Sequence, residues 1–434
     1  MSNAPMTPHP AAGSREIFAW AMYDFANSGY TTVVLTAIYS AYFVGVVANS
    51  SNTGDATFLW TLAIAIANSL VLISAPILGA IADRQAWKKR FLIITTVGCA
   101  VGTAMLATTG PGDVAWATGW IVLASFLYYT GENLIAAFLP EIAPHGRMGW
   151  ISGYGWTIGY LGGLAVLALC LAYIRYAQAH GSPATHYVPM TMLIVAVCFV
   201  LAALPTFLWL RERTVPQPRM AGIGYIRMGW RRLLASWTHA RHYVDLTRFL
   251  FAVCVFHCGI NTVIVLAAIY AQQAMGFTMQ DTLLLIIVVN LTAAVGAALF
   301  GRLQDRIGAI TTLRITLLIW ICAMILAYFA TERPGFWVVA NLVGLAMGAS
   351  QSAGRALVGL FCPPERAAEF FGLWGVAVKL ANIIGPLSYG VIAAVTAGNH
   401  RVALVTTVVY FALGFALLFA VDEKRGRAAA GLHY

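Results

Sequence analysis

Charged residues are scarce in this sequence. Asp, Glu, Lys and Arg together make up 10% of the 434 residues, whereas 60% of the residues are hydrophobic. Soluble globular domains carry about 25% charged residues, so the composition excludes an ordinary soluble domain. The mean hydropathy is +0.78, and many apolar runs reach the roughly 20 residues that a membrane-spanning helix needs. Both features indicate a polytopic membrane protein.

Several chemical signatures are also missing. The seven cysteines form no CxxC pair and lie in or beside apolar runs, which favours buried thiols over disulfides or a metal site. No HExxH motif, Ser-His-Asp set, paired-carboxylate set or Walker loop is present. The sequence therefore predicts neither an enzyme nor an ATP-driven pump, and it implies no cofactor. The polar start MSNAPMTPHPAAGS lacks the apolar region of a signal peptide, so we expect the first hydrophobic segment to remain as a membrane helix.

Apolar runs between charged or Gly/Pro-rich breaks predict twelve spans in two halves of six. We expect the first six spans at 17–47, 57–81, 91–109, 114–139, 149–174 and 188–210. The second six are expected at 247–271, 280–302, 311–330, 336–361, 370–396 and 401–421. This organisation gives six-helix bundles over 17–210 and 247–421, a connector over 211–246, and tails over 1–16 and 422–434.

The basic residues predict the orientation. If both termini are cytoplasmic, the inner segments hold 21 of the 26 Lys and Arg residues, as the positive-inside rule requires. The same asymmetry accounts for the net charge of +10, so no nucleic-acid partner is needed to explain it. Within the connector, IGYIRMGWRRLLASWTHARHYV mixes apolar and basic residues at helical spacing. This pattern is typical of an amphipathic helix on the inner leaflet, although a partner-binding site shares it.

One short pattern occurs at equivalent positions in the two halves. GAIADR ends the second span and GRLQDR ends the eighth, which aligns Gly79, Asp83 and Arg84 with Gly301, Asp305 and Arg306. We expect the glycine to allow close helix packing, the aspartate to cap a neighbouring helix N-terminus, and the arginine to anchor a tight inner loop.

This repeated loop resembles the signature of the major facilitator superfamily, which occurs once in each half. The first copy departs from the pattern at Ala86, where a Gly is usual, whereas the second copy keeps its Gly308. The resemblance implies an all-α integral membrane protein with twelve transmembrane helices, whose first, fourth, seventh and tenth spans line a central cavity. We expect the two signature loops to act as conformational switches.

Polar residues gather on those four spans and on the eleventh. The candidates for the substrate and proton pathway are Asp24, Asn27, Glu132, Asn133, His257, Asn261, Gln351, Arg355 and Lys379. Aromatic residues near the Gly-rich stretches or near Asp24 are secondary cavity candidates: Tyr23, Tyr154, Trp156, Tyr160 and Trp374.

Four charged candidates lie deep in the predicted spans. Asp24 and Glu132 belong to the first half, and Arg355 and Lys379 belong to the second, at comparable depth. Because charges persist in a membrane when they are paired or line water, we expect ion pairs across the halves that open as the halves rock. The alternatives are that Arg355 extends to the lipid headgroups and that Glu132 forms a static hydrogen bond within its own half.

Longer segments resemble the autophagy-related vacuolar amino-acid effluxers and their bacterial relatives. The matching stretches include WAMYDFANSGY at 20–30, NLIAAFLPEIAP at 133–144, ISGYGWTIGYLGG at 151–163 and GASQSAGRALVGLFCPPERAAEFFGLW at 348–374. One stretch differs, because FHCGINT places Cys258 where this family usually carries an acidic residue.

The resemblance implies export of amino acids or similar small solutes by a secondary transporter that works by alternating access. A carboxylate in the cavity can carry protons, so we expect Asp24 or Glu132 to link this transport to proton movement. The protein is expected to act as a monomer in the lipid bilayer of a bacterial inner membrane. Two alternatives remain open: a transporter for another solute, such as a siderophore, peptidoglycan fragment or drug, and a non-transporting receptor on the same fold.

Overall fold

The computed structural model describes residues 12–48, 53–144, 146–216, 243–396 and 400–431. Over these residues the chain forms helices and no β-strand, so the predicted all-α fold class is confirmed. Within the described ranges, eleven helices are long and apolar enough to cross a membrane, and the number is twelve if a bent pair, Leu404–Ala420 with Glu423–Ala429, is counted as one span. The predicted amphipathic helix of the connector covers residues 223–244, and all but the last two of these lie outside the described residues.

The N-terminal half contains the first six spans. They are α1 (Ser14–Tyr30) with its continuation to Val47, α3 (Thr53–Gln85), α4 (Lys88–Met105), α5 (Val114–Ala136), α7 (Met148–Ala179) and α8 (Ala184–Trp209). A short helix, α6 (Leu139–Ile142), lies between α5 and α7.

The C-terminal half repeats this arrangement. Its spans are α10 (Val244–Met275), α11 (Met279–Ile307), α12 (Ala309–Phe329), α13 (Arg333–Phe361), α14 (Ala367–Val395) and α15 (His400–Leu417). A further short helix, α16 (Glu423–Ala429), follows in the segment that was predicted only as a tail.

The first span changes its winding halfway along. After α1 it forms two π-helical segments, η1 (Thr31–Ala37) and η2 (Phe43–Val47), on either side of α2 (Tyr39–Tyr42). Hydroxyl groups bond the carbonyls of this stretch, since Thr36 donates to the Thr31 carbonyl at 3.0 Å and Ser40 to the Thr36 carbonyl at 3.0 Å. π-Helical turns are rare and concentrate at functional sites.

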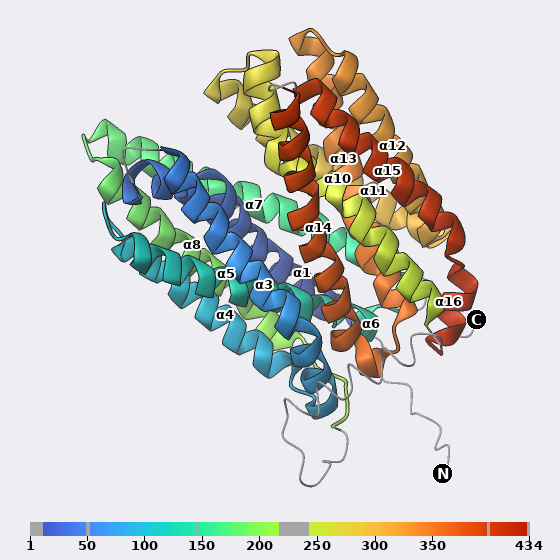
Figure 1. Cartoon of the computed structure of the whole chain (residues 1–434). Helices are drawn as coiled ribbons and strands as arrows, with labels where there is room; N and C mark the ends of the chain where they lie inside the picture. The colour runs from blue at the N-terminus through green and yellow to red at the C-terminus, as the bar shows by residue number, and fades with distance from the viewer. Residues whose placement is uncertain (1–11, 49–52, 145, 217–242, 397–399, 432–434) are drawn as a thin grey trace.

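Both signature loops lie at the same end of the molecule, which we call the motif end because it carries Asp83 and Asp305. The two halves lie closest there and diverge toward the opposite end (Figure 1). The halves are joined chiefly by two helix pairs, α3 with α14 and α7 with α11, and α13 also packs against α7.

Glycines allow the backbones of these helix pairs to touch. A Cβ atom at Gly301 would lie 2.7 Å from the Gly149 carbonyl oxygen and 3.0 Å from Gly153 Cα. In the other pair, a Cβ atom at Gly372 would lie 2.8 Å from the Ala75 carbonyl oxygen, and one at Gly79 would collide with the Ala368 carbonyl. The close packing predicted for Gly79 and Gly301 is confirmed by these contacts.

The two signature loops turn differently, and this difference predicts opposite effects of Gly/Ala exchange. Gly308 has φ +91° and ψ 154°, a region essentially restricted to glycine, so Gly308→Ala is expected to cost about 1–3 kcal/mol of stability. Ala86 is held at φ +53°, and relief of that strain in Ala86→Gly is expected to gain up to about 1 kcal/mol. Thermal unfolding of the purified protein measures both. Shifts of the same sign in the two variants would contradict this account of the loops.

Candidate functional site

Each signature aspartate caps a helix of the opposite half. The Asp83 carboxylate, at the end of α3, accepts hydrogen bonds from the backbone N–H groups of Ala368 at 3.1 Å and Glu369 at 2.9 Å. The Asp305 carboxylate, at the end of α11, accepts from Gly149 and Trp150, each at 2.8 Å. Since these amides begin α14 and α7, the predicted capping is confirmed. The role of the two loops as switches remains a prediction.

A buried lysine supports the first of these caps. The Lys88 side chain is fully buried, its ammonium forms an ion pair with Glu141, and it lies 3.5 Å from the Asp83 carboxylate. A buried ammonium is stable only with such partners. In the sequence, Lys88 stands in the basic run Lys88-Lys89-Arg90 just after the loop. Nothing in that run indicates that Lys88 is buried between two carboxylates.

At the motif end, each half also contains an ion pair formed by an acidic residue on its first helix. In the N-terminal half, the Glu16 carboxylate binds the Arg213 guanidinium through two hydrogen bonds of 2.7 Å. In the C-terminal half, the Asp245 carboxylate binds the Arg425 guanidinium at 2.6 and 2.7 Å. We call these two ion pairs the clasps.

A second carboxylate beside each clasp caps a helix within the same half. Glu212 accepts from the amides of Lys88 at 2.9 Å and Lys89 at 3.1 Å, at the start of α4. Glu423 accepts from the Ile310 amide at 3.1 Å, at the start of α12. The only signal for this repeat in the sequence is a short mixed-charge run after the sixth and twelfth spans, RER at 211–213 and DEKR at 422–425.

Further into the molecule, Asp24 and Arg355 join the two halves. The Arg355 guanidinium donates to the Asp24 carboxylate at 2.7 Å, and it also donates to the Ser152 hydroxyl at 3.2 Å and the Ser152 carbonyl at 2.9 Å. The arginine is only 4% exposed. It is therefore satisfied inside the protein and does not extend to lipid headgroups.

Two indole rings enclose this ion pair. The guanidinium carbon of Arg355 lies 4.6 Å from the ring centre of Trp20 and 5.2 Å from that of Trp156. Trp20 is itself fixed, since its indole N–H donates to the Ile135 carbonyl at 2.8 Å. A Cβ atom at Gly155 would lie 2.7 Å from an Arg355 nitrogen and 2.6 Å from the Trp20 ring. Only glycine leaves room for the pair at this turn of α7.

The second pair across the halves, Glu132 with Lys379, is looser. The Lys379 ammonium lies 3.9 Å from the Glu132 carboxylate and 3.3 Å from the ring centre of Tyr129. The two side chains differ in exposure, because Glu132 is 31% exposed and Lys379 only 5%. This pair is therefore open to solvent on its carboxylate side, in contrast to Asp24 with Arg355.

Three predicted amide residues have buried side-chain atoms with unused hydrogen-bonding capacity. Among the described residues, the Asn27 side-chain carbonyl and the Asn133 and Asn261 side-chain NH₂ groups have no hydrogen-bond partner. A Cβ atom at Gly375 of α14 would lie 2.5 Å from the Asn133 amide nitrogen. Buried amides without partners are costly, so these groups have the capacity to bind a polar solute.

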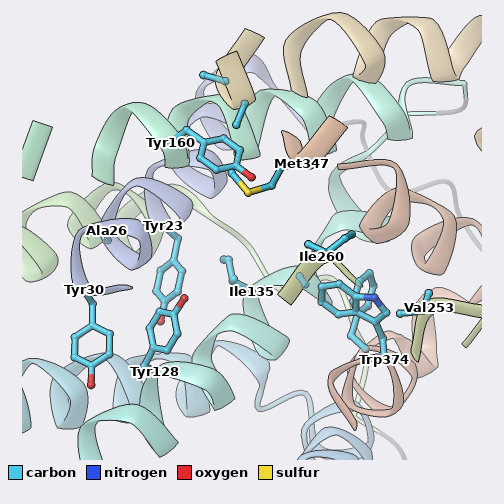
Figure 2. Packing of buried hydrophobic residues seen from close by; sticks show 14 of the residues in the cluster. Tyr23, Ala26, Tyr30, Tyr128, Ile135, Tyr160, Val253, Ile260, Met347 and Trp374 are labelled. Carbon is cyan, nitrogen blue, oxygen red and sulfur yellow. The ribbon is translucent and has the colours of Figure 1, made fainter. Parts of the chain in front are cut away.

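Two further candidates are placed by contacts to other side chains or to the backbone. The Tyr160 hydroxyl donates to the Gln351 side chain at 2.9 Å, which links α7 to α13 across the halves. His257, in contrast, lies with its Nδ1 atom 3.2 Å from the Val253 carbonyl of its own helix. Figure 2 shows Tyr160 beside Met347 of α13, and Trp374 beside Ile260 of α10.

The remaining aromatic candidates differ in their surroundings. The indole N–H groups of Trp156 and Trp374 have no hydrogen-bond partner among the described residues. Tyr154 stacks on Trp150, with 5.8 Å between the ring centres. Tyr23 lies within the N-terminal half, where its hydroxyl is 2.8 Å from the Thr96 hydroxyl of α4. The structure thus brings the charged candidates together but places Tyr23 away from them.

Two six-helix halves, joined by reciprocal helix caps and by ion pairs between opposite charges, define the fold of the major facilitator superfamily. The structure is similar to the human organic anion transporter MFSD10, with a TM-score of 0.72 and 16% identity over 93% of this chain and 99% of that one. It is also similar to the proton:xylose symporter XylE, with a TM-score of 0.70 and 15% identity over 95% and 96% of the two chains. At these identities the likeness concerns the fold.

The family profile described as "Vacuole effluxer Atg22 like" matches residues 146–431. The chain therefore belongs to this family of major facilitator transporters, as the sequence predicted, and the family consists of transporters rather than enzymes.

Two curated relatives agree with this assignment. An uncharacterized MFS-type transporter, YxiO of Bacillus subtilis, is 28% identical over 417 residues, which cover 94% of each chain. Autophagy-related protein 22 of Yarrowia lipolytica is 25% identical over 335 residues, 70% of this chain and 55% of that protein. The chain is thus a multi-pass membrane transporter.

Proposed function

We propose that the protein is a proton-linked secondary transporter that exports amino acids or similar small zwitterionic solutes by alternating access. The observation that carries the proposal is the pair of ion pairs between the halves, Asp24 with Arg355 and Glu132 with Lys379. A zwitterion carries one ammonium and one carboxylate, so it offers a partner to both signs of charge when the halves separate.

The two ion pairs differ in solvent exposure, and this difference supports an assignment of the conformational state. Arg355 is buried and makes three hydrogen bonds to Asp24 and Ser152. At the motif end, the Asp83 carboxylate is buried and caps α14, and Asp305 caps α7 from an exposed position. The Glu132 side chain is partly exposed, and the halves diverge away from the motif end (Figure 1). We propose that this arrangement is the outward-facing state, in which solvent reaches Glu132 from the side opposite the motif end.

The ring surfaces near the charges suit a solute with an apolar part. Trp156 and Trp374 offer indole N–H groups without partners in the described part of the chain, and Tyr160 lies beside Trp156, with 5.6 Å between the ring centres. Aromatic rings provide apolar contact together with a polar atom at the edge. We propose that these rings contact the side chain of the transported amino acid.

The proposal includes a cellular setting. The loops at the motif end contain most of the basic residues, which supports a cytoplasmic motif end with both termini inside. A bacterial relative matches over 94% of each chain, which supports residence in a bacterial inner membrane. The protein is proposed to act there as a monomer, with each molecule carrying its own site.

The proposed substrate class is tested by a thermal-shift screen of the purified protein against amino acids, peptides and siderophores. Amino acids are expected to raise the melting temperature, and the strongest of them is then followed as flux in proteoliposomes with and without a pH gradient. Stabilisation by siderophores or peptides alone would assign a different substrate. Binding without flux would indicate a receptor.

Glu132→Gln is expected to remove the stimulation of flux by a pH gradient, because the amide cannot exchange a proton with either side. The gradient-driven rate should fall by a factor on the order of ten, as is typical of the coupling between two sites. Counterflow of labelled solute without a gradient should persist. Glu365→Gln is the matched control, since Glu365 is an exposed glutamate between α13 and α14. Unchanged dependence on the gradient in Glu132→Gln would exclude Glu132 as the proton carrier.

A further inference from the structure

Lys379 occupies a cation site that is built by the opposite half of the molecule. The site consists of the ring face of Tyr129 and the carboxylate of Glu132, and we call it the α5 seat. Lys379 reaches it from α14, with its ammonium 3.3 Å from the Tyr129 ring centre and 3.9 Å from a Glu132 oxygen. A ring face with an adjacent carboxylate is a general recognition site for ammonium groups.

Lys379 occupies the α5 seat, but its ammonium makes no hydrogen bond there to any of the described residues. An ammonium has three N–H donors, yet among the described residues Lys379 makes no hydrogen bond, because its carboxylate neighbour lies beyond hydrogen-bonding distance. Arg355 makes three such bonds to Asp24 and Ser152 in the same part of the molecule. Lys379 is therefore the cation that another ammonium can replace at lower cost.

The difference in solvent exposure between Glu132 and Lys379 favours such a replacement by an ammonium that arrives from the solvent. The Glu132 side chain is 31% exposed, whereas that of Lys379 is 5% exposed. A free ammonium can thus approach the carboxylate from water while the lysine lies on its protein side. Tyr129 and Glu132 are three residues apart on α5, so they move together, whereas Lys379 moves with the other half.

We propose that Lys379 is a tethered substitute for the ammonium group of the solute, and that solute binding displaces it from the α5 seat. The seat then holds one cation in either state, Lys379 in the absence of solute and the solute ammonium in its presence. This inference rests on the proposed function for the identity of the solute, but the seat itself can be tested without it. The opposite assignment, in which Lys379 binds the carboxylate of the solute, predicts opposite results.

The first test removes the tether and supplies a free cation. Lys379→Ala lacks the three carbons and the ammonium that n-propylammonium carries. We expect n-propylammonium to raise the melting temperature of Lys379→Ala by roughly 2 °C or more, and to leave Glu132→Gln/Lys379→Ala unchanged. Propionate should have no effect on either variant. Stabilisation by propionate, or by neither ion, would overturn the proposal.

The second test uses Lys379→Met, which keeps an unbranched apolar side chain and therefore serves also if the alanine variant does not fold. Leucinamide carries the amino group of an amino acid without a free carboxylate, and 4-methylpentanoate carries the carboxylate without the amino group. Removal of a tethered competitor should tighten leucinamide binding about tenfold or more, with no gain for 4-methylpentanoate. Equal or weaker leucinamide binding by Lys379→Met would overturn the assignment.

The outcomes separate this inference from the proposed function. If amino acids neither bind nor move while n-propylammonium stabilises Lys379→Ala, the α5 seat stands and the substrate class is wrong. If amino acids are transported while Lys379→Ala ignores n-propylammonium, the transporter stands and the tethered-cation role of Lys379 is excluded.

Discussion

Asp24→Asn is expected to destabilise the conformation closed at the motif end by about 3–5 kcal/mol, the usual cost of leaving a buried charge without its partner. Arg355 is 4% exposed and loses its only carboxylate partner within 4 Å among the described residues. The double variant Asp24→Asn/Arg355→Gln removes both charges and should recover part of the loss. The recovered part measures how much of the penalty is the unpaired guanidinium.

The measurement needs both a stability and a conformational readout. Thermal unfolding gives the first, and the distance between spin labels at Arg90 and Glu365, both exposed, reports the opening of the motif end. Arg333→Gln is the matched control, because it breaks an ion pair to Asp281 in which Arg333 is 53% exposed. Such surface pairs contribute about 1 kcal/mol or less. An effect of Asp24→Asn no larger than that of Arg333→Gln would contradict a buried, essential pair.

Asp83→Asn and Asp305→Asn are expected to have unequal effects, although the two positions are equivalent in the repeat. Both variants weaken the cap on a helix of the opposite half, which costs about 1 kcal/mol. Asp83 also lies 3.5 Å from the ammonium of Lys88, which is fully buried. Its replacement should therefore cost about 3 kcal/mol or more, as for other buried charges that lose a partner.

The inequality should appear in the same spin-label distance and in the melting temperature. We expect Asp83→Asn to widen the distribution between the labels at Arg90 and Glu365, and Asp305→Asn to change it less. In the Asp83→Asn/Lys88→Met double variant, the loss of stability should come closer to that of Asp305→Asn. Equal losses for the two aspartates would mean that Lys88 is stabilised by Glu141 alone.

The fold and the charged residues at its centre were predictable from the sequence. Apolar length and the placement of basic residues are strong signals, and a carboxylate in an apolar span has few stable surroundings. Asp24, Glu132, Arg355 and Lys379 were therefore recognised without coordinates, and ion pairs between the two halves were predicted. The partner of Asp24 was not, because two cations lie at similar depth and only helix packing selects Arg355.

The ion pairs at the motif end could not be predicted from the sequence, for a different reason. Arg213, Arg425 and Lys88 lie where the positive-inside rule already expects basic residues, so their presence did not call for carboxylate partners. Tyr23 was misleading for a geometric reason. It adjoins Asp24 in sequence, but neighbouring residues on a helix lie about 100° apart, and its ring points into the N-terminal half toward α4.

The π-helical stretch between Thr31 and Val47 has a consequence for how the first span is compared with that of relatives. Each π-turn holds one residue more than the α-turn it replaces, and one extra residue rotates everything after it by about 100°. Side chains beyond Tyr30 therefore face a different direction from the one an uninterrupted α-helix would give them. A relative with a regular first span is expected to be one residue shorter here for each such turn. An alignment without gaps would then match cavity-facing positions with lipid-facing ones.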